Sequence, residues 1–156
     1  MELSYTAVCF DLFGTLVDPE GNSVDGARGA LHLLPADRWA IVTSCGSAYA
    51  RMLIASAGLP EPQVLVASDD VERGKPAPDP YVTGAERLRV APGDVLVVED
   101  SRDGIAAGRS AGMDVLAILR GRGLAFARDA SFQVERFSDI VWALDENGSI
   151  RVQIEP

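Results

Sequence analysis

The residue best placed for chemistry is Asp11, which ends the apolar run Ala7-Val8-Cys9-Phe10 and enters a turn that contains Gly14. Such a run predicts a strand that is covered on both faces. A carboxylate at the carboxyl end of a parallel strand lies where open α/β sheets bind their ligands. There it can act as a nucleophile and form an aspartyl-phosphate or an aspartyl ester. Gly14 and Thr15 allow a sharp turn, and we expect their N–H groups to face a phosphoryl group.

Lys75 is the second group with a chemical role. It is the only lysine in the chain, and it lies in the segment Gly74-Lys75-Pro76-Ala77-Pro78-Asp79-Pro80, where glycine and prolines favour an irregular loop. An ammonium group held rigidly can neutralise charge on a nucleophile and on a transferring group. We therefore interpret Lys75 as a catalytic and substrate-binding residue rather than as a surface lysine.

Thr43 and Ser44 carry hydroxyl groups and follow a second apolar run, Ala40-Ile41-Val42. The Ser44 hydroxyl and the N–H of Cys45 can hold phosphoryl oxygens, and Thr43 can exchange roles with Ser44. A serine at the end of a strand can equally begin the next helix. The presence of Asp11 and Lys75 in the same chain favours phosphate binding as the role of Ser44.

A cluster of carboxylates supplies the groups for a metal site. Glu99 and Asp100 close the apolar run Val95-Leu96-Val97-Val98, and Asp103 follows shortly after. Hard oxygen ligands of this kind suit Mg²⁺. Asp103 can equally be a first-turn helix residue that the helix dipole favours. Several carboxylates close to one lysine would repel each other strongly, so a bound cation is the better interpretation.

Together these segments resemble the motifs of the haloacid dehalogenase-like hydrolase superfamily, over roughly residues 6–145. The branch that they resemble most contains the sugar-phosphate phosphatases and β-phosphoglucomutase. The resemblance implies a three-layer α/β sandwich with a mostly parallel, Rossmann-like sheet. It also implies a Mg²⁺-dependent phosphohydrolase that works through an aspartyl-phosphate. In that interpretation Asp11, Asp100 and the backbone carbonyl of Phe13 bind the metal directly, Glu99 binds it through water, and Asp103 is an alternate ligand.

Phe13 departs from the family pattern, because phosphatases of this family carry Asp at that position. The Asp protonates the leaving oxygen and then activates water, and Phe can do neither. Loss of a general acid–base typically costs roughly 10²–10⁴ in rate. We therefore expect weak turnover that is best with good leaving groups, such as aryl or acyl phosphates.

The second departure is the short loop over residues 18–24, where relatives of this branch carry a helical cap domain. We therefore expect a single core domain over residues 1–156, without a cap and with an open site. Capless relatives act on large substrates or borrow a lid from another subunit, and an exposed apolar patch in place of the cap would favour a homo-oligomer. A naturally capless protein, a remnant and a shortened chain all fit the sequence.

Two other functions stay open. Dehalogenases of the superfamily carry an aromatic residue at the Phe13 position and work without metal, although their fourth motif lacks a Glu-Asp pair. Alternatively, the lost Asp and the lost cap indicate a catalytically impaired remnant that binds phosphate or protein.

Composition and charge limit the partners. The chain has 156 residues, 47% of them hydrophobic, and a formal charge of −9. This charge argues against nucleic acid and anionic membranes, so the expected partner is a phosphorylated small molecule or a larger phospho-substrate. No apolar run is long enough to span a membrane, and no export signal is visible, so we expect a cytoplasmic protein with Cys9 and Cys45 reduced.

Apolar runs alternate with helical patterns, which is typical of βαβ units and a parallel sheet. The expected strands are residues 6–10, 40–43, 64–67, 95–99, 115–119 and 132–134. The expected helices are residues 25–34, 47–57, 79–88, 104–111 and 138–144. The Asn147-Gly148 turn and the alternating residues 150–154 predict an edge strand or hairpin at the end of the sheet. We interpret His32, Trp39 and Trp142 as residues without a catalytic role. We favour the same interpretation for Arg102, with contact to a substrate anion at an open site as the alternative.

Overall fold

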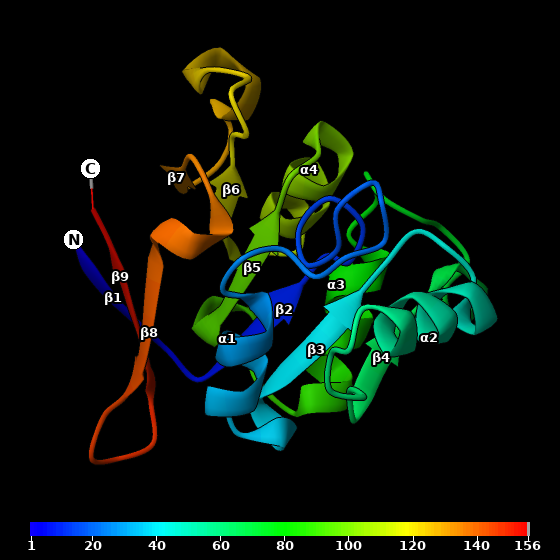
Figure 1. Ribbon diagram of the computed structural model, residues 1–156, viewed down its shortest axis with the longest axis horizontal. Helices are drawn as coiled ribbons and strands as arrows, with labels where there is room; N and C mark the ends of the chain where they lie inside the picture. Colours follow the sequence, from blue (N-terminus) through cyan, green and yellow to red (C-terminus); the bar gives the residue numbers. More distant parts are fainter. Residues whose placement is uncertain (156) are drawn as a thin grey trace.

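A parallel sheet forms the centre of the molecule (Figure 1), which we describe from a computed structural model over residues 1–155. Its six strands lie in the order β4 (Val64–Val66), β3 (Trp39–Val42), β2 (Ala7–Phe10), β5 (Val95–Glu99), β6 (Asp114–Ile118) and β7 (Phe132–Val134). All adjacent pairs are parallel; Phe10, for example, pairs with Ile41 on one side and with Val98 on the other. The strands expected from the sequence are confirmed to within a residue at each end.

Helices cover both faces of this sheet. They are α1 (Ala27–Leu33), α2 (Ser47–Ser56), α3 (Asp79–Leu88) and α4 (Arg102–Ser110). Side chains of β2 alternate between two buried clusters, since Val8 and Phe10 pack with α1 and α2, whereas Ala7 and Cys9 pack with α3 and α4. Burial on both faces explains why β2 is wholly apolar. The three-layer α/β sandwich is therefore confirmed.

The C-terminal part of the chain differs from the expectation. Residues 138–144 were expected to form a helix, but this prediction is wrong: a short 3₁₀ turn, Phe137–Asp139, leads into strand β8 (Ile140–Leu144). Strand β8 pairs antiparallel with β9 (Ile150–Ile154), and Trp142 packs on Phe10 with ring centroids 5.5 Å apart. Strand pairing and aromatic packing thus outweigh the local helical pattern.

A second, antiparallel sheet contains this hairpin. Its order is β1 (Glu2–Tyr5), β9, β8, so the tail does not extend the parallel sheet as expected. Strand β1, which was not expected, pairs with β9 in the register Leu3↔Val152. The first and last strands, β1 and β9, therefore lie side by side (Figure 1). None of the helices within residues 1–155 combines the length and the apolarity needed to cross a bilayer.

The direction of the chain across the parallel sheet reverses at β2. From β2 the chain runs to β3 and β4 on one side, and then returns to β5, β6 and β7 on the other side. Ligands of open α/β sheets bind at such a switch point, outside the carboxyl ends of the strands. Asp11 follows β2 and Asp100 follows β5, so both residues lie at this switch point.

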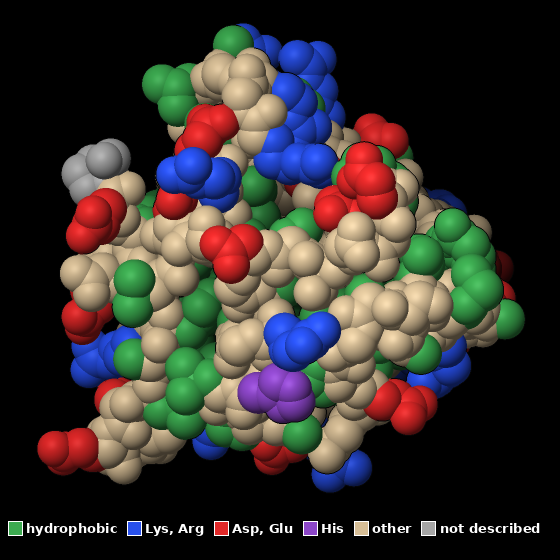
Figure 2. Space-filling model, viewed as in Figure 1, with side chains coloured by type: hydrophobic (Ala, Val, Ile, Leu, Met, Phe, Trp, Pro, Cys, Tyr) green, Lys and Arg blue, Asp and Glu red, His purple; other side chains and the backbone are tan. Residues whose placement is uncertain are grey.

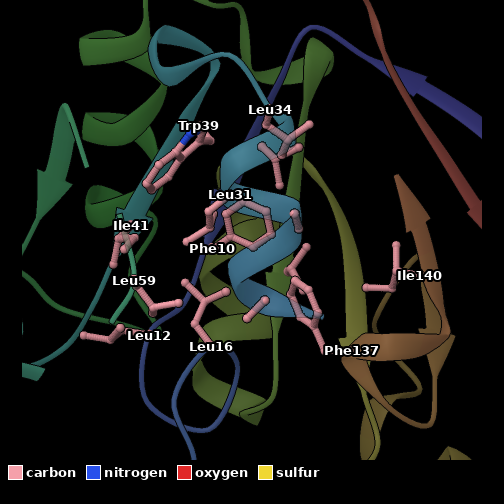
Figure 3. Close-up of a cluster of buried hydrophobic side chains, with 14 of the residues drawn as sticks. Phe10, Leu12, Leu16, Leu31, Leu34, Trp39, Ile41, Leu59, Phe137 and Ile140 are labelled. Atoms are coloured by element: carbon pink, nitrogen blue, oxygen red, sulfur yellow. The ribbon is translucent and has the colours of Figure 1, made fainter. Parts of the chain in front are cut away.

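The loop after β2 is anchored in the core. Leu12 and Leu16 are fully buried, together with Phe10 and Leu31, in the cluster around α1 (Figure 3). Phe13, between the two leucines, is 51% exposed. The loop then closes in a tight turn at residues 18–22, where the Asp18 N–H donates to the Asn22 carbonyl at 2.8 Å. Burial of the leucines fixes the backbone that carries Asp11.

Candidate active site

Lys75 and Asp11 form a buried ion pair at the carboxyl end of β2. The Lys75 Nζ atom donates to Asp11 Oδ1 at 2.9 Å, to Glu99 Oε1 at 2.6 Å and to the Val42 carbonyl at 3.0 Å. All three ammonium protons therefore have acceptors, and the Lys75 side chain is only 3% exposed. The loop that carries Lys75 thus joins the ends of three neighbouring strands, β3, β2 and β5.

Glu99 is completely buried and accepts hydrogen bonds on both oxygens. Its Oε1 accepts from Lys75 and, at 2.6 Å, from the Tyr81 hydroxyl. Its Oε2 accepts from the Ser101 hydroxyl at 3.2 Å and from the N–H groups of Asp100 and Ser101 at 3.1 and 3.3 Å. Glu99 therefore holds Lys75 and the turn into α4 in place.

Asp100 lies against the turn that follows Asp11. The Thr15 hydroxyl is 3.1 Å from Asp11 Oδ2 and 3.4 Å from Asp100 Oδ1, and it can donate to one of them at a time. Gly14 has a φ of +86°, and a Cβ atom there would lie 2.1 Å from Asp100 Oδ2. Glycine is thus required both by the backbone conformation and by the close approach of the carboxylate.

Burial sets the charge state of these groups. Burial raises the pKa of Asp11 to about 6, against the opposing effect of Lys75. Burial also raises the pKa of Glu99 and that of Asp100. Burial opposes the charged form of Lys75, but the carboxylates of Asp11 and Glu99 outweigh it and hold its pKa above the usual range. Because the carboxylates outnumber the single buried ammonium group, the site favours a cation.

The oxygen atoms present fit a magnesium ion. One carboxylate oxygen from each of Asp11, Glu99 and Asp100 lies within 4.8 Å of the other two. The backbone carbonyl of Phe13 accepts no hydrogen bond from residues 1–155 and is free to act as a further ligand. Asp103 lies at the start of α4 and is exposed, outside this cluster. The donors are hard oxygens, as Mg²⁺ prefers.

Most of the sequence-predicted site residues share one open cavity of about 850 Å³, whereas Gly14, Thr15 and Glu99 do not line it. Those that line it are Asp11, Phe13, Thr43, Ser44, Cys45, Lys75, Asp100, Arg102 and Asp103. Ser44 is exposed to the cavity, whereas the buried Thr43 hydroxyl accepts from the Cys45 N–H at 3.3 Å. The Cys45 N–H, expected to hold a phosphoryl oxygen, is therefore engaged with the neighbouring side chain.

The turn after Asp11 also uses donors that were expected to face the substrate. The N–H of Gly14 donates to Val17 at 2.7 Å, and that of Thr15 donates to Leu12 at 3.3 Å, because the tight turn closes on itself. This part of the expectation is wrong. The N–H groups of Leu12 and Phe13 find no acceptor within residues 1–155, so they are the donors left for an anion. His32 is exposed on α1 and does not line the cavity, as expected.

Sequence reasoning missed four residues around the site. Tyr81 donates to Glu99, and its ring centroid lies 5.1 Å from Lys75 Nζ. Arg120 and Arg122 lie 3.6 and 3.9 Å from Asp100 Oδ2, and Arg122 stacks on Phe126. The two arginines follow the predicted strand at 115–119, so the rule that identified Asp11 and Asp100 could have found them. Tyr81 and Phe126 lack such a signal.

Comparison with known proteins agrees with this geometry. The sequence model of the haloacid dehalogenase-like hydrolase family matches residues 20–118, which include Ser44, Lys75 and Asp100. The match begins beyond Asp11. Because it covers more than half of the chain, the protein belongs to the haloacid dehalogenase-like hydrolase family.

Sugar- and polyol-phosphate phosphatases are among its relatives. Hexitol phosphatase A of Escherichia coli is 36% identical over 115 residues, which cover 74% of this chain and 53% of that protein. Glycerol-1-phosphate phosphohydrolase 2 of Saccharomyces cerevisiae is 33% identical over 130 residues, which cover 79% of this chain and 49% of that protein. The chain thus spans about half the length of these curated relatives.

Solved structures show the same fold. A Thermotoga maritima protein described as a β-phosphoglucomutase is 31% identical, with a TM-score of 0.69 over 75% of this chain and 57% of that chain. A hydrolase of the same family from Deinococcus radiodurans, solved with phosphate and sodium, has a TM-score of 0.78 at 22% sequence identity. The match covers 86% of this chain and 92% of that chain. The second likeness concerns the fold alone.

Proposed function

We propose that this protein is a Mg²⁺-dependent phosphohydrolase in which Asp11 attacks the phosphorus atom of a phosphate monoester. The observation that carries the proposal is the environment of Asp11. Its Oδ1 is held by Lys75 at 2.9 Å and its Oδ2 is 3.1 Å from the Thr15 hydroxyl, in a cavity shared with Ser44 and Asp100. A carboxylate fixed in this way at a strand end can be aimed at a bound ester.

The reaction takes place in two steps. An Asp11 oxygen forms a bond to phosphorus, and the bond from phosphorus to the ester oxygen breaks. The leaving oxygen takes its proton from solvent, because the Phe13 side chain has none to give. Water then attacks the phosphorus of the aspartyl-phosphate, which releases inorganic phosphate and restores the Asp11 carboxylate. Ser44 and the free N–H groups of Leu12 and Phe13 hold the phosphoryl oxygens in both steps, and the positive charge of Lys75 offsets the negative charge that develops beside Asp11.

The residues that would hold Mg²⁺ are Asp11, Asp100 and the carbonyl of Phe13, with Glu99 acting through water and Asp103 as an alternate ligand. When bound, the ion supplies positive charge that offsets the phosphoryl group and the carboxylates. Lys75 offsets only one of the two negative charges of Asp11 and Glu99, so the ion has to balance the remaining carboxylate charge together with that of Asp100 and the substrate. Metal and phosphate binding should therefore strengthen each other.

Phe13 limits the rate in this proposal. The side chain is 51% exposed at the cavity and offers an apolar surface where an acid would be needed. Esters with a good leaving group do not need that acid, so aryl and acyl phosphates should be the best substrates.

We also propose that residues 1–156 form one capless core domain in the cytoplasm. Phe13 and Tyr49 are half-exposed at the cavity, and we propose that they contribute to a contact in a homo-oligomer.

The test is turnover of p-nitrophenyl phosphate by the purified protein with and without Mg²⁺. We expect turnover with Mg²⁺ that a chelator abolishes and that Asp11→Asn removes. Asp37→Asn, at an exposed position outside the cavity, is the control and should keep the wild-type rate. Turnover that survives Asp11→Asn would contradict the proposal. Halide release from a 2-haloacid in the presence of the chelator would instead support attack on carbon.

A further inference from the structure

A pair of arginines beside the catalytic cavity has no role in the chemistry proposed above. We propose that Arg102 and Arg122 bind a second negative charge on the substrate, so that the site prefers phosphate esters whose leaving group carries a carboxylate or another phosphate. The inference rests on the proposed function, because it assigns the substrate class of the same site. Figure 2 shows basic side chains gathered over the loop that follows β6 in Figure 1.

Arg122 is held rigidly with part of its guanidinium free. Its Cζ atom lies 3.9 Å from the centroid of the Phe126 ring. Its Nε donates to the Leu119 carbonyl at 2.8 Å, and its Nη2 donates to the Ile118 carbonyl at 3.0 Å. The Nη1 donors have no acceptor within residues 1–155. A stacked, preorganised guanidinium with free donors loses little entropy when it binds an anion.

Arg102 joins this arrangement from the start of α4. Its Cζ atom lies 5.6 Å from the centroid of the same Phe126 ring. The residue is exposed, and within residues 1–155 it has neither an ion-pair partner nor a hydrogen-bond acceptor for its side chain. Two guanidinium groups near one aromatic ring repel each other, and an anion bound by both would relieve that repulsion.

Both arginines and Phe126 line the cavity that contains Asp11. A phosphoryl group at Asp11 leaves the remaining space, within about 850 Å³, for the leaving group. The acidic neighbours are Asp100, 3.9 Å from Arg122, and Asp103, which lines the cavity next to Arg102. Asp100 would be largely neutralised by the metal, so it does not satisfy Arg122. The cavity therefore offers cationic donors beyond those needed at phosphorus, in a protein whose formal charge is −9.

The inference is tested by binding, so that it does not depend on turnover. 3-Phosphoglycerate and glycerol 3-phosphate differ in a carboxylate that replaces a hydroxymethyl group. We would measure their dissociation constants by titration calorimetry with the Asp11→Asn variant in Mg²⁺, alone and combined with Arg102→Gln or Arg122→Gln. Arg51→Gln is the matched control, since Arg51 forms an exposed ion pair with Glu61 and does not line the cavity.

We expect 3-phosphoglycerate to bind roughly tenfold more tightly or better, as a charge-assisted hydrogen bond would provide. Each cavity variant should remove most of that preference and leave glycerol 3-phosphate almost unchanged. Equal binding of the two esters, binding of neither, or an equal loss for both esters in Arg122→Gln would overturn the inference. A preference that exists while the wild-type protein fails to hydrolyse p-nitrophenyl phosphate in Mg²⁺ would support the inference and overturn the proposed function.

Discussion

Phe13 leaves the candidate site without a proton donor for the leaving group. We predict that Phe13→Asp raises kcat for an alkyl phosphate such as glycerol 3-phosphate by roughly 10²–10⁴, because it restores a general acid–base. The gain in kcat/KM, which reports the transfer of the phosphoryl group to Asp11, should be much smaller for p-nitrophenyl phosphate, whose leaving group needs no proton. Steady-state kinetics with both substrates in Mg²⁺ checks this, with Tyr49→Asp at the same cavity as the control. An alkyl phosphate rate that stays at the wild-type level would count against the mechanism.

Lys75 balances two buried carboxylates, and its removal should cost stability as well as activity. Lys75→Met leaves Asp11 and Glu99 without their shared cation, in a place where the lysine side chain is only 3% exposed. Breaking a buried ion pair in this way costs about 3–5 kcal/mol. Urea unfolding at pH 7 measures the loss, and Arg73→Met, with a side chain that is 72% exposed, should be nearly neutral. A Lys75→Met protein as stable as the wild type would show that the ion pair is not formed.

The raised pKa of Asp11 predicts how pH affects stability when Mg²⁺ is absent. Its pKa is about 6 in the folded protein and 3.8 ordinarily, so the folded state binds the proton more tightly. Protonation of Asp11 therefore stabilises the folded state. This stabilisation is complete below pH 3.8 and is lost as pH rises through about 6. Asp11→Asn should remove this contribution, so the difference in unfolding free energy between the two proteins should change across that interval. A difference that is independent of pH in chelator would contradict the assignment.

At the scale of elements, α4 can begin where it does only because residue 104 is glycine. A Cβ atom there would lie 1.9 Å from the carboxyl carbon of Glu99. We predict that Gly104→Ala destabilises the protein by about 1–3 kcal/mol and disturbs Lys75 through Glu99. Gly29→Ala is the matched control, because this glycine lies in α1 with nothing within 4 Å of the added atom. It should stabilise by about 0.5–1 kcal/mol in thermal unfolding, and an equal effect of the two variants would refute the prediction.

The elements of the parallel sheet could be predicted because their sequences carry local signals. Strands such as β2 and β5 are apolar runs that end in a carboxylate, and the helices between them have regular apolar spacing. Strand β1 carries no such signal, since its partner β9 lies at the other end of the chain. Strand β8 was mistaken for a helix for the same reason: its pairing with β9 and the packing of Trp142 on Phe10 are tertiary effects.

At the scale of the whole molecule, the site is assembled where the strand order reverses. Asp11, Ser44 and Asp100 meet in one cavity, as their positions after strands predict, and Lys75 joins them from the loop between β4 and α3. The position of individual donors could not be predicted in this way. Whether the N–H of Gly14 points to a ligand or to Val17 depends on how the turn closes, and the role of Phe126 depends on how the loop after β6 folds back.

The most direct test of the account is to locate the phosphoryl group on the protein. We would mix the protein with Mg²⁺ and acetyl phosphate, quench the reaction in acid within its first turnover, and map the modified peptide by mass spectrometry. We predict a phosphoryl group on Asp11 that appears only with Mg²⁺ and is absent from Asp11→Asn. The account would be contradicted if phosphate is released while Asp11 stays unmodified, or if the phosphoryl group is found on another residue.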